Sequence, residues 1–600
     1  MDDLSRAEVI LCGTGLVQSI LASALARAGK KVLHCDASDY YGELDAVWTL
    51  PYLRTQATVV PNESNEDGLL SSRGSLQSLR IHSFTERTEF EVQMDSEVST
   101  PYGRGRVTEI TTDRVSIVLD HWKLANDSHP TLCIGLSSLD KPLTEHLASL
   151  GIVSEKTRQA RKLLHEWERS FALDLTPSLL YAHGAAVDGL LLSQVADYLE
   201  FKSLEGLFYY RNQTIQPVPC SKQDVFASTL LSPLEKRRLM KFLQLALDYG
   251  NDEGLNERRL NQGRSLARPQ NKAHEASGVL SGVDRLFDEY LQTDQKLSPQ
   301  LSELVRYALA LEPSPTCTLQ QGLDSLCHHM QALGRFGGTA FLAPLYGAGE
   351  LPQAFCRSAA VYGATYLLRS RPEEIVMDET VVQGVRIDCQ GESRLIECDH
   401  VVAPVEGSNA DYTKRVLRRI CAYRGKLLEG KQQRHVVVVP PSETFGAVMH
   451  GMLFDETSNV VPHAPWGCTL VHWTAVVGKD QDDSSFVEAS NAVLATLESD
   501  ADEIFQLTFS YGLYETVPDG PETLHWVSRG SPRIDMDLAF QQAEAIFAKI
   551  CPGAGFLLRS EEIDKLVKER VGDMEEDEEQ AVLESAMGLV DKKEEKTEES

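Results

Sequence analysis

The first forty residues carry the hydrophobic pattern of a βαβ unit. The apolar run at 9–12 predicts one buried strand, and residues 31–36 predict a second strand that ends on Asp36. Between them Leu16, Ile20 and Ala24 recur at helical spacing, and Gly29 is placed to end the helix. The order strand, helix, strand predicts an α/β fold of the nucleotide-binding kind.

The turn between the first strand and the helix contains Gly13 and Gly15 but lacks the third glycine of a dinucleotide-binding loop. Gln18 stands in that place, where a side chain fills the groove that a pyrophosphate would occupy at the helix N-terminus. Asp36 keeps the position of a ribose-binding acid. We expect a vestigial loop and no cofactor, and bound FAD or NAD is the alternative.

The regular alternation of hydrophobic and polar positions weakens after residue 55 and returns near residue 103. Residues 55–100 are polar with little periodicity, so we expect a partly disordered insertion that extends to about residue 135. Within it, 103–110 and 114–119 alternate like two paired strands and predict a small β-barrel-like module. The charges on these strands are more typical of a solvated face than of a binding site.

Residues 142–331 are expected to be mostly helical, interrupted by a strand at 203–210. Ser232-Pro233-Leu234-Glu235 is a helix start, because the serine and the glutamate form a capping box. Three amphipathic stretches begin near Leu234, Leu286 and Leu301, and they predict a small helical domain. The polar residues 250–282 are expected to form a loop between them.

These patterns divide the chain into four parts. We predict a first part of an α/β domain at 1–221, a helical domain at 222–331, and a second α/β part at 332–558. The second α/β part has strands at 376–377, 381–387, 400–402 and 434–439 and a closing helix at 540–550. The remainder, 559–600, is predicted to be an acidic disordered tail, since 561–600 holds sixteen Asp and Glu against six Lys and Arg.

Composition excludes several classes of function. The formal net charge of −30 argues against a nucleic-acid partner, because phosphate binding needs a basic surface. The twelve cysteines stand singly with no C-x-x-C, so we expect reduced thiols and no structural metal. No apolar run approaches the roughly 20 residues of a membrane span, and no signal peptide is evident. We expect a cytosolic protein.

The densest pattern after the N-terminus lies at 336–357. Glu350, Gln353 and Arg357 follow a glycine turn at spacings of three and four residues, which places them on one face of a helix. Leu351, Phe355 and Ala359 fall on the opposite face. The polar face is typical of a recognition surface, and it holds no nucleophile beside a base, so we expect no catalytic residues. An intrahelical ion pair on a solvated face explains the pattern equally well.

This helix and several other segments resemble the signature blocks shared by Rab GDP-dissociation inhibitors and Rab escort proteins. The matching block at 347–357 reads Gly-Ala-Gly-Glu-Leu-Pro-Gln-Ala-Phe-Cys-Arg and continues through 361–368. The other matching segments are 13–16, Asp36, 40–42, 198–202, 205–206, 235–238, 542–544 and 550–552. The long insertion after Tyr40-Tyr41-Gly42 and the acidic C-terminus are similar to the escort branch, which is component A of Rab geranylgeranyl transferase.

The resemblance implies a flavoprotein-like α/β fold of several sheets with a smaller all-helical domain, and no flavin. Ser528-Arg529-Gly530-Ser531 agrees with this, because a flavoenzyme typically carries an acid after that glycine. The resemblance also implies a Rab-binding platform, in which Tyr41 packs on the GTPase switch region and charged side chains bond to it. The implied platform residues are Tyr41, Arg335, Glu350, Gln353, Arg357, Thr365 and Leu367.

The function implied is presentation rather than catalysis. An escort protein binds GDP-bound Rab GTPases, presents them to the Rab geranylgeranyl transferase heterodimer, shields the attached geranylgeranyl groups and delivers Rab during transient membrane contact. Phe242 and Leu243 are candidate transferase or lipid contacts, although a helix stripe is more often core. Two alternatives stay open: a GDP-dissociation inhibitor that recycles prenylated Rabs, and an FAD-dependent amine oxidase-like enzyme.

Overall fold

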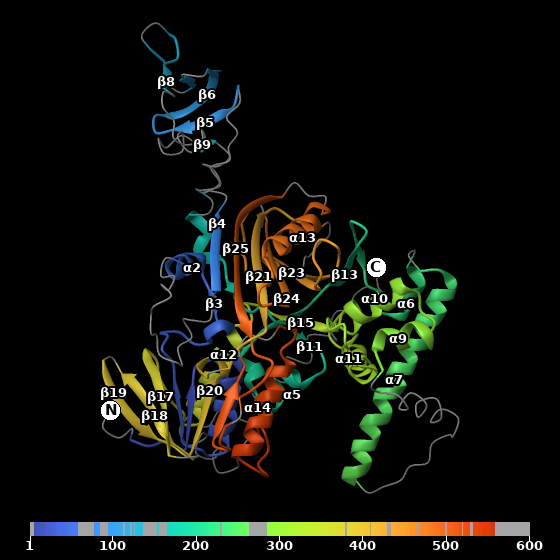
Figure 1. Ribbon diagram of the computed structural model, residues 1–600. Helices are drawn as coiled ribbons and strands as arrows, with labels where there is room; N and C mark the ends of the chain where they lie inside the picture. The colour runs from blue at the N-terminus through green and yellow to red at the C-terminus, as the bar shows by residue number, and fades with distance from the viewer. Residues whose placement is uncertain are drawn as a thin grey trace, which may run out of the picture.

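Figure 1 shows the computed structural model of the 600-residue chain. The residues that it describes are 5–57, 77–83, 94–111, 114–120, 123–124, 127–135, 153–154, 162, 165–228, 231–262, 285–378, 381–389, 391–408, 410–428, 434–464, 467–497, 501–518, 520–528 and 532–558. Four segments with sequence-based predictions lie outside the described residues: 58–76 and 84–93 of the insertion, 529–531, and the tail at 559–600.

A five-stranded parallel sheet carries the predicted βαβ unit. Its order is β16 (Thr365–Leu367), β2 (Val32–Cys35), β1 (Val9–Cys12), β20 (His400–Pro404) and β26 (Leu524–Val527). Successive β1 residues point to opposite faces of the sheet. Val9 and Leu11 face a helical layer of α1 (Leu16–Arg27), α5 (Ala185–Ser193), α12 (Glu350–Val361) and α14 (Asp537–Ile550). Ile10 and Cys12 face a three-stranded sheet of β17 (Ser370–Asp378), β18 (Val381–Cys389) and β19 (Glu392–Glu397).

An eight-stranded sheet forms the second layer of the α/β body. Its order is β14 (Thr214–Pro217), β13 (Gly206–Arg211), β22 (His435–Val439), β23 (Met449–Asp455), β24 (Cys468–Gly478), β21 (Lys414–Arg424), β25 (Asp502–Leu513) and β4 (Gln77–Ser83). Helix α13 (Ser484–Ala495) covers one face, where Trp473 and Phe486 are buried. The other face contributes to the largest apolar core, which continues into the helical region.

Smaller sheets join these layers. Strand β3 (Val47–Trp48) pairs with β10 (Leu173–Asp174), and β15 (Phe341–Pro344) lies between β11 (Leu180–Tyr181) and β12 (Phe201–Ser203). A separate five-stranded sheet contains β8 (Thr131–Gly135), β7 (Arg114–Leu119), β6 (Gly103–Ile110), β5 (Glu97–Thr100) and β9 (Val153–Ser154) around its own small core. Figure 1 shows this sheet apart from the body, beyond the end of β4.

The helical region lies beside the large sheet, as Figure 1 shows at the right. It contains α6 (Lys222–Ala227), α7 (Pro233–Gln262), α9 (Phe287–Thr293), α10 (Pro299–Leu304), the π-helical turn η5 (Val305–Leu309) and α11 (Leu319–Ala332). The predicted capping box begins α7: the Glu235 N–H donates to Ser232 Oγ at 3.3 Å, and the Ser232 N–H donates to the Glu235 carboxylate at 3.0 Å. The division of the chain into domains at 221, 331 and 558 stays a prediction.

Short elements complete the description: η1 (Glu43–Asp45), α2 (Leu50–Ala57), η3 (Glu168–Ser170), η4 (Val195–Tyr198), η6 (Val405–Gly407) and η7 (Glu456–Ser458). Most predicted strands and helices are confirmed, including the βαβ unit, the pair β6–β7 and the closing helix α14. The apolar residues of these elements recur with periods of two or 3.6 residues, so the sequence predicts them. The α/β class is confirmed with them.

Three predictions of local structure are wrong. The expected helical stretch contains the strands β10, β11 and β14, whose two to four residues are too short to display a period. Helix α7 continues to Gln262, into the predicted polar loop at 250–282, since a polar stretch is also compatible with a solvated helix; the rest of that loop lies outside the described residues. Strand β4 lies within the insertion and pairs with the edge of β25, a tertiary contact that local pattern does not encode.

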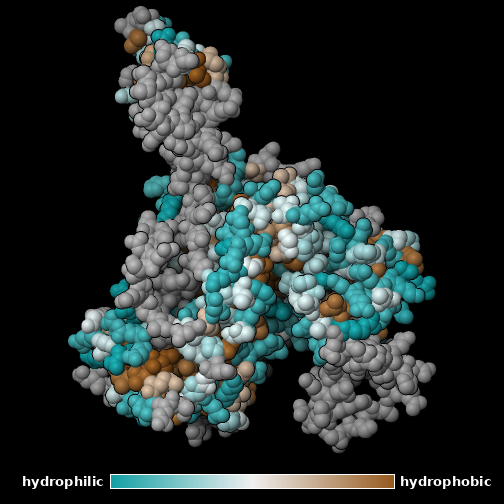
Figure 2. Space-filling view, viewed as in Figure 1, coloured by the Kyte–Doolittle hydropathy of each residue, from teal (hydrophilic) through white to brown (hydrophobic). Residues whose placement is uncertain are grey.

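None of the helices in the described ranges is long and apolar enough to cross a bilayer. Figure 2 shows a largely hydrophilic face, with a hydrophobic patch at the lower left over the end of the molecule that holds β17–β19, and smaller patches over the helical region. Exposed apolar side chains in these parts include Met377, Val381 and Leu395 in the three-stranded sheet and Phe226 and Leu234 near the start of α7.

Candidate functional site: a polar groove beside a filled dinucleotide loop

The loop between β1 and α1 is closed by the chain's own hydrogen bonds. The Asp36 carboxylate accepts bonds from the Thr14 N–H at 2.9 Å, the Thr14 hydroxyl at 2.6 Å and the Ser38 N–H at 2.7 Å. Asp36 is buried. The acid that a ribose would need is therefore already bonded within the protein, at the place that the sequence pattern assigns to it.

Carboxylates occupy the position of a pyrophosphate at the N-terminus of α1. The Leu16 N–H donates to Asp45 Oδ2 at 2.8 Å, and a Cβ at Gly13 would overlap the Glu43 carboxylate. A helix N-terminus favours an anion, and here the chain supplies two. Gln18 is buried beside Gly15, as the sequence predicts. The residues present do not fit a dinucleotide phosphate, since it would meet negative charge and filled space.

The sequence pattern identifies Gln18 but misses Glu43 and Asp45. Both belong to the short helix η1 and come after Gly42, which has a φ of +106°. Glu43 is itself left-handed with a φ of +49°, an uncommon conformation for a residue with a side chain. In the sequence, Tyr40-Tyr41-Gly42 is informative only as a motif that resembles the family. Its geometry is what brings η1 over the loop.

A groove of about 380 Å³ lies on the exposed side of α12. The core face of this helix is as predicted, with Leu351, Phe355 and Ala359 fully buried. The groove brings together four of the predicted platform residues from two parts of the chain: Tyr41, Glu350, Gln353 and Arg357. The same groove is also lined by Tyr198, Leu199, Ala354, Cys356, Ala360 and Tyr366.

Two aromatic contacts shape the groove. The guanidinium of Arg357 lies over the ring of Tyr198, with 4.6 Å between its central carbon and the ring centroid. Tyr41 meets the ring of Tyr366 edge-on, with centroids 5.6 Å apart. Arg357 therefore stacks on an aromatic ring from η4, and this contact orients its guanidinium at the groove. Sequence reasoning missed Tyr198 and Tyr366 as lining residues.

Glu350 has an unusual environment at the other end of the groove. It accepts a hydrogen bond from the backbone N–H of Tyr346, while burial and the neighbouring Glu200 carboxylate raise its pKa. Its Oε2 is buried and has no hydrogen-bond partner in the described part of the chain. Burial also raises the pKa of Tyr41. An acceptor without a donor is costly when buried, so a rearrangement of the Glu350 side chain that brings Oε2 to a donor is favourable.

The remaining predicted platform residues lie elsewhere. Thr365 and Leu367 belong to the edge strand β16, and Leu367 packs toward the core shared with β17 and β18, whereas Tyr366 between them reaches the groove. Arg335 is exposed in the loop 333–340 and donates to the Ala182 carbonyl at 3.3 Å. The groove thus unites four of the seven, and the other three border it or stand apart.

Phe242 and Leu243 belong to the helical core. Phe242 is fully buried and Leu243 nearly so. In this conformation Phe242 has no surface with which to touch a partner, because α7 packs on α11 through that face. Leu243 lines a small apolar cavity of about 50 Å³ together with Val225, Met240, Leu247 and Met330. Phe242 is therefore a core residue of the helical region.

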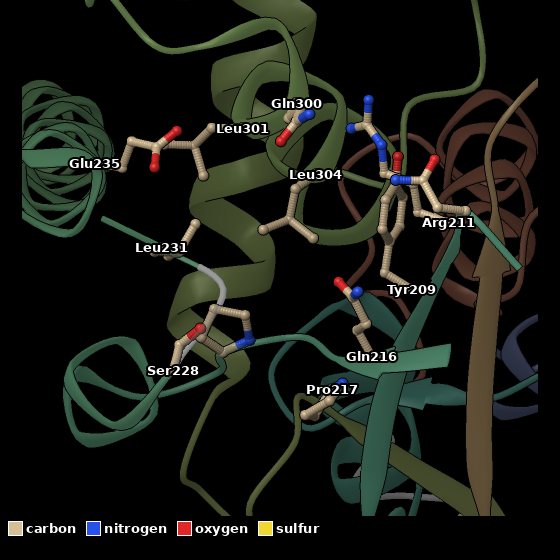
Figure 3. Close-up of a pocket in the computed structure, with 12 residues that line it drawn as sticks. Tyr209, Arg211, Gln216, Pro217, Ser228, Leu231, Glu235, Gln300, Leu301 and Leu304 are labelled. Carbon is tan, nitrogen blue, oxygen red and sulfur yellow. The ribbon is translucent and has the colours of Figure 1, made fainter. Parts of the chain in front are cut away.

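Two further hollows separate the large sheet from the helical region. Figure 3 shows a pocket of about 160 Å³ between Tyr209 and Gln216 of the β13–β14 hairpin and Leu301 and Leu304 of α10. Its rim carries Arg211, which forms an ion pair of 3.0 Å with Glu303. A larger hollow of about 520 Å³ adjoins it and shares Gln216, Pro217, Pro219 and Ser228.

Comparison with known proteins shows the family of this chain. The family model described as GDP dissociation inhibitor matches residues 1–69, 152–275 and 283–530. The chain belongs to the GDP dissociation inhibitor family. The unmatched stretch 70–151 contains β4 and four strands of the separate β-sheet, β5, β6, β7 and β8, whereas its fifth strand β9 lies in the matched part.

Within the family, the chain is similar to proteins named Rab proteins geranylgeranyltransferase component A. The rat component A 1 is 27% identical, with 92% of each chain covered. The human component A 2 is 28% identical, with 92% of this chain and 91% of the relative covered. Among solved structures, the Rab GDI of Plasmodium falciparum has a TM-score of 0.58 at 18% identity, covering 91% of this chain and 98% of that one, which shows a shared fold.

Proposed function

We propose that this protein is a Rab escort protein: it binds newly made GDP-bound Rab GTPases, presents them to Rab geranylgeranyl transferase and delivers the prenylated Rab to membranes. The observation that supports this most is the groove on α12, with an unpaired buried acceptor on Glu350 and a stacked cation on Arg357. It offers polar recognition of a protein surface. The relatives named component A cover nearly the whole chain, and they favour this branch over the inhibitors.

Recognition in this proposal uses the polar and aromatic side chains that line the groove. Tyr41 packs on the GTPase switch region, Glu350 accepts a hydrogen bond from it, and Arg357 donates to it. Switch loops change conformation when the γ-phosphate is absent, so a surface that fits one conformation selects the GDP state. Thr365, Leu367 and Arg335 then contact parts of the Rab outside the groove.

The protein acts as a non-catalytic accessory subunit in the cytosol, and the transferase carries out the chemistry. The helical region is the proposed transferase side. Phe226 and Leu234 are 68% and 56% exposed, and the Lys236 ammonium donates to the Phe226 carbonyl at 2.7 Å, which ties the end of α6 to the start of α7. Two exposed apolar side chains held together in this way suit a protein contact.

The small cavity beside Leu243 is the proposed entrance for a geranylgeranyl group. Its walls are mostly apolar and include Met240 and Met330, whose flexible side chains repack readily. The cavity of about 50 Å³ is much smaller than the lipid, so α7 and α11 must separate to admit it. Transfer to a membrane is feasible because burial of a methylene stabilises by about 0.8 kcal/mol in either place.

A prenylation assay tests the proposal. Unprenylated GDP-loaded Rab, the transferase heterodimer and geranylgeranyl diphosphate are combined with and without this protein. We expect lipid transfer only when the protein is present, and full-rate transfer without it would exclude the escort function. Failure to form a ternary complex with unprenylated Rab and transferase, together with extraction of prenylated Rab from membranes, would favour a GDP-dissociation inhibitor instead.

Variants in the same assay test the transferase side. Phe226→Asp with Leu234→Asp is expected to abolish the ternary complex while Rab binding stays intact. Leu538→Asp on α14 is the matched control, because Leu538 is 46% exposed and apolar but lies outside the helical region. Equal loss in both variants would contradict the proposed position of the transferase.

A further inference from the structure

Residues 41–47, here the bridging segment, begin at the groove and contact the N-terminal ends of both α1 and α12. The segment begins with Tyr41, which lines the groove, and ends with Val47 in strand β3. Near its start the Gly42 N–H donates to the Thr14 hydroxyl at 3.0 Å, within the loop that precedes α1. The bridging segment therefore runs from the groove across the filled dinucleotide loop.

Asp45 ties the bridging segment to α1. Its Oδ2 accepts the Leu16 N–H at 2.8 Å, and its Oδ1 accepts the Thr176 hydroxyl at 2.7 Å. The first amides of a helix have no partner within the helix, so this carboxylate satisfies one of them and interacts favourably with the helix dipole. In a dinucleotide-binding protein the bound phosphate makes this contact.

Asp174 ties the other end of the bridging segment to α12. Val47 pairs in register with Asp174 in the β3–β10 ladder. The Asp174 carboxylate in turn accepts the Gly349 N–H at 3.3 Å, at the N-terminus of α12. The approach leaves no room for a side chain: a Cβ on Gly349 would lie 2.6 Å from the Val47 nitrogen. The segment and the start of α12 are thus held in one arrangement.

We infer that Asp45 and Asp174 are positioning residues, which hold Tyr41 at a fixed place relative to Glu350 and Arg357 on α12. The inference rests on the proposed Rab-binding function of the groove. An internal carboxylate takes over the contact of the lost cofactor phosphate, so that the former cofactor cradle fixes a protein-binding surface. Without these ties the bridging segment is free to move, and a partner must pay the entropy of ordering it on binding.

The experiment measures the Kd of GDP-loaded, unprenylated Rab for the full-length protein and for variants. We expect Asp45→Ala to raise Kd at least tenfold and to speed hydrogen exchange in peptides that cover 41–47. Asp45→Asn keeps an oxygen that accepts the Leu16 N–H, and we expect its Kd within threefold of wild type. Asp174→Ala is expected to act like Asp45→Ala and to speed exchange at 347–351 as well.

Two controls separate positioning from a general loss of stability. Asp455 is a buried carboxylate that accepts the Thr457 N–H at 3.0 Å at another helix start, so Asp455→Ala lowers the melting temperature but should leave Kd unchanged. In a Tyr41→Ala background, Asp45→Ala should weaken binding no further, because its effect passes through Tyr41. A purely structural role would instead add to the effect of Tyr41→Ala.

The outcomes distinguish the inference from the proposed function. If wild type does not bind GDP-loaded Rab, the proposed function fails and the positioning role fails with it. If wild type binds and Asp45→Ala binds equally well, the groove stands and the positioning inference is overturned. It is also overturned if Asp45→Ala and Asp455→Ala weaken binding alike.

Discussion

The guanidinium of Arg357 is stacked on the ring of Tyr198, 4.6 Å from its centroid, although the two residues are 159 positions apart in the chain. The tyrosine belongs to η4 and is half exposed, so the pair forms part of the groove's surface. It replaces the intrahelical ion pair between Glu350 and Arg357 that the sequence alone leaves open. Arg357 is thus oriented by an aromatic ring from another part of the chain.

Arg357→Ala and Tyr41→Ala are each expected to weaken Rab binding by on the order of 1–3 kcal/mol, through the loss of a charged hydrogen bond or an aromatic anchor. Titration of fluorescently labelled GDP-loaded Rab measures the change. Lys414→Ala, an exposed cation paired with Glu515 at the surface, serves as the control and should have no effect. Unchanged affinity in both groove variants would mean that the Rab-binding surface lies elsewhere.

Tyr198→Ala removes the ring beneath Arg357 and is expected to weaken Rab binding by about 0.5–1 kcal/mol, the value of an exposed cation–π contact. Tyr198→Phe keeps the aromatic face and should bind like wild type. In an Arg357→Ala background the tyrosine substitution should have no further effect. Additive losses would show that Tyr198 contacts the Rab independently of Arg357.

The purified protein is expected to be colourless and to take up no added FAD, because Asp45, Glu43 and Gln18 fill the pyrophosphate position. Absorbance in the flavin band after gel filtration with excess FAD provides the measurement. A known amine oxidase run in parallel shows that the assay detects bound flavin. Flavin that co-elutes in stoichiometric amount would contradict the filled loop.

Because of His329, the free energy of unfolding depends on pH. Burial lowers its pKa to about 3, and the ordinary value of 6.5 applies in the unfolded chain. Between these values the unfolded state binds a proton that the folded state does not, so stability falls as pH falls from 6.5 toward 3. His329→Phe removes the titrating group and with it this loss of stability. Relative to wild type, the free energy of unfolding of the variant should therefore be about 2 kcal/mol higher at pH 5 than at pH 8.

Denaturant unfolding at the two pH values measures this effect. Leu538→Ala is the control, since Leu538 is exposed and carries no titratable group, so it should give the same difference from wild type at both pH values. His329 sits edge-on to Tyr181 and Phe341, so an aromatic replacement suits its surroundings. An equal difference from wild type at pH 5 and pH 8 for His329→Phe would contradict a neutral buried histidine.

Much of the α/β body is predictable from local sequence. Alternating and helical periods predict β1, α1, β2, β6, β7 and α14, and the capping box at Ser232 predicts the start of α7. The spacing of Glu350, Gln353 and Arg357 predicts their common face, and the groove confirms that they lie together. Each of these features depends on residues within a few positions of one another, where the backbone period is decisive.

Other features require the tertiary structure. Local sequence is sufficient to predict the βαβ unit, its missing glycine and the polar face of α12, and the sequence motifs indicate a specific family. Three contacts become visible only in the tertiary structure. Asp45 and Glu43 fill the dinucleotide loop, and Asp174 accepts a hydrogen bond from Gly349. Arg357 stacks on Tyr198 instead of pairing with Glu350. These pairs are separated by 29 to 175 positions or lie on different elements, and no local period relates them. Their contacts arise because sheets and helices built from distant segments pack into one core, which fixes side chains that carry no pattern of their own.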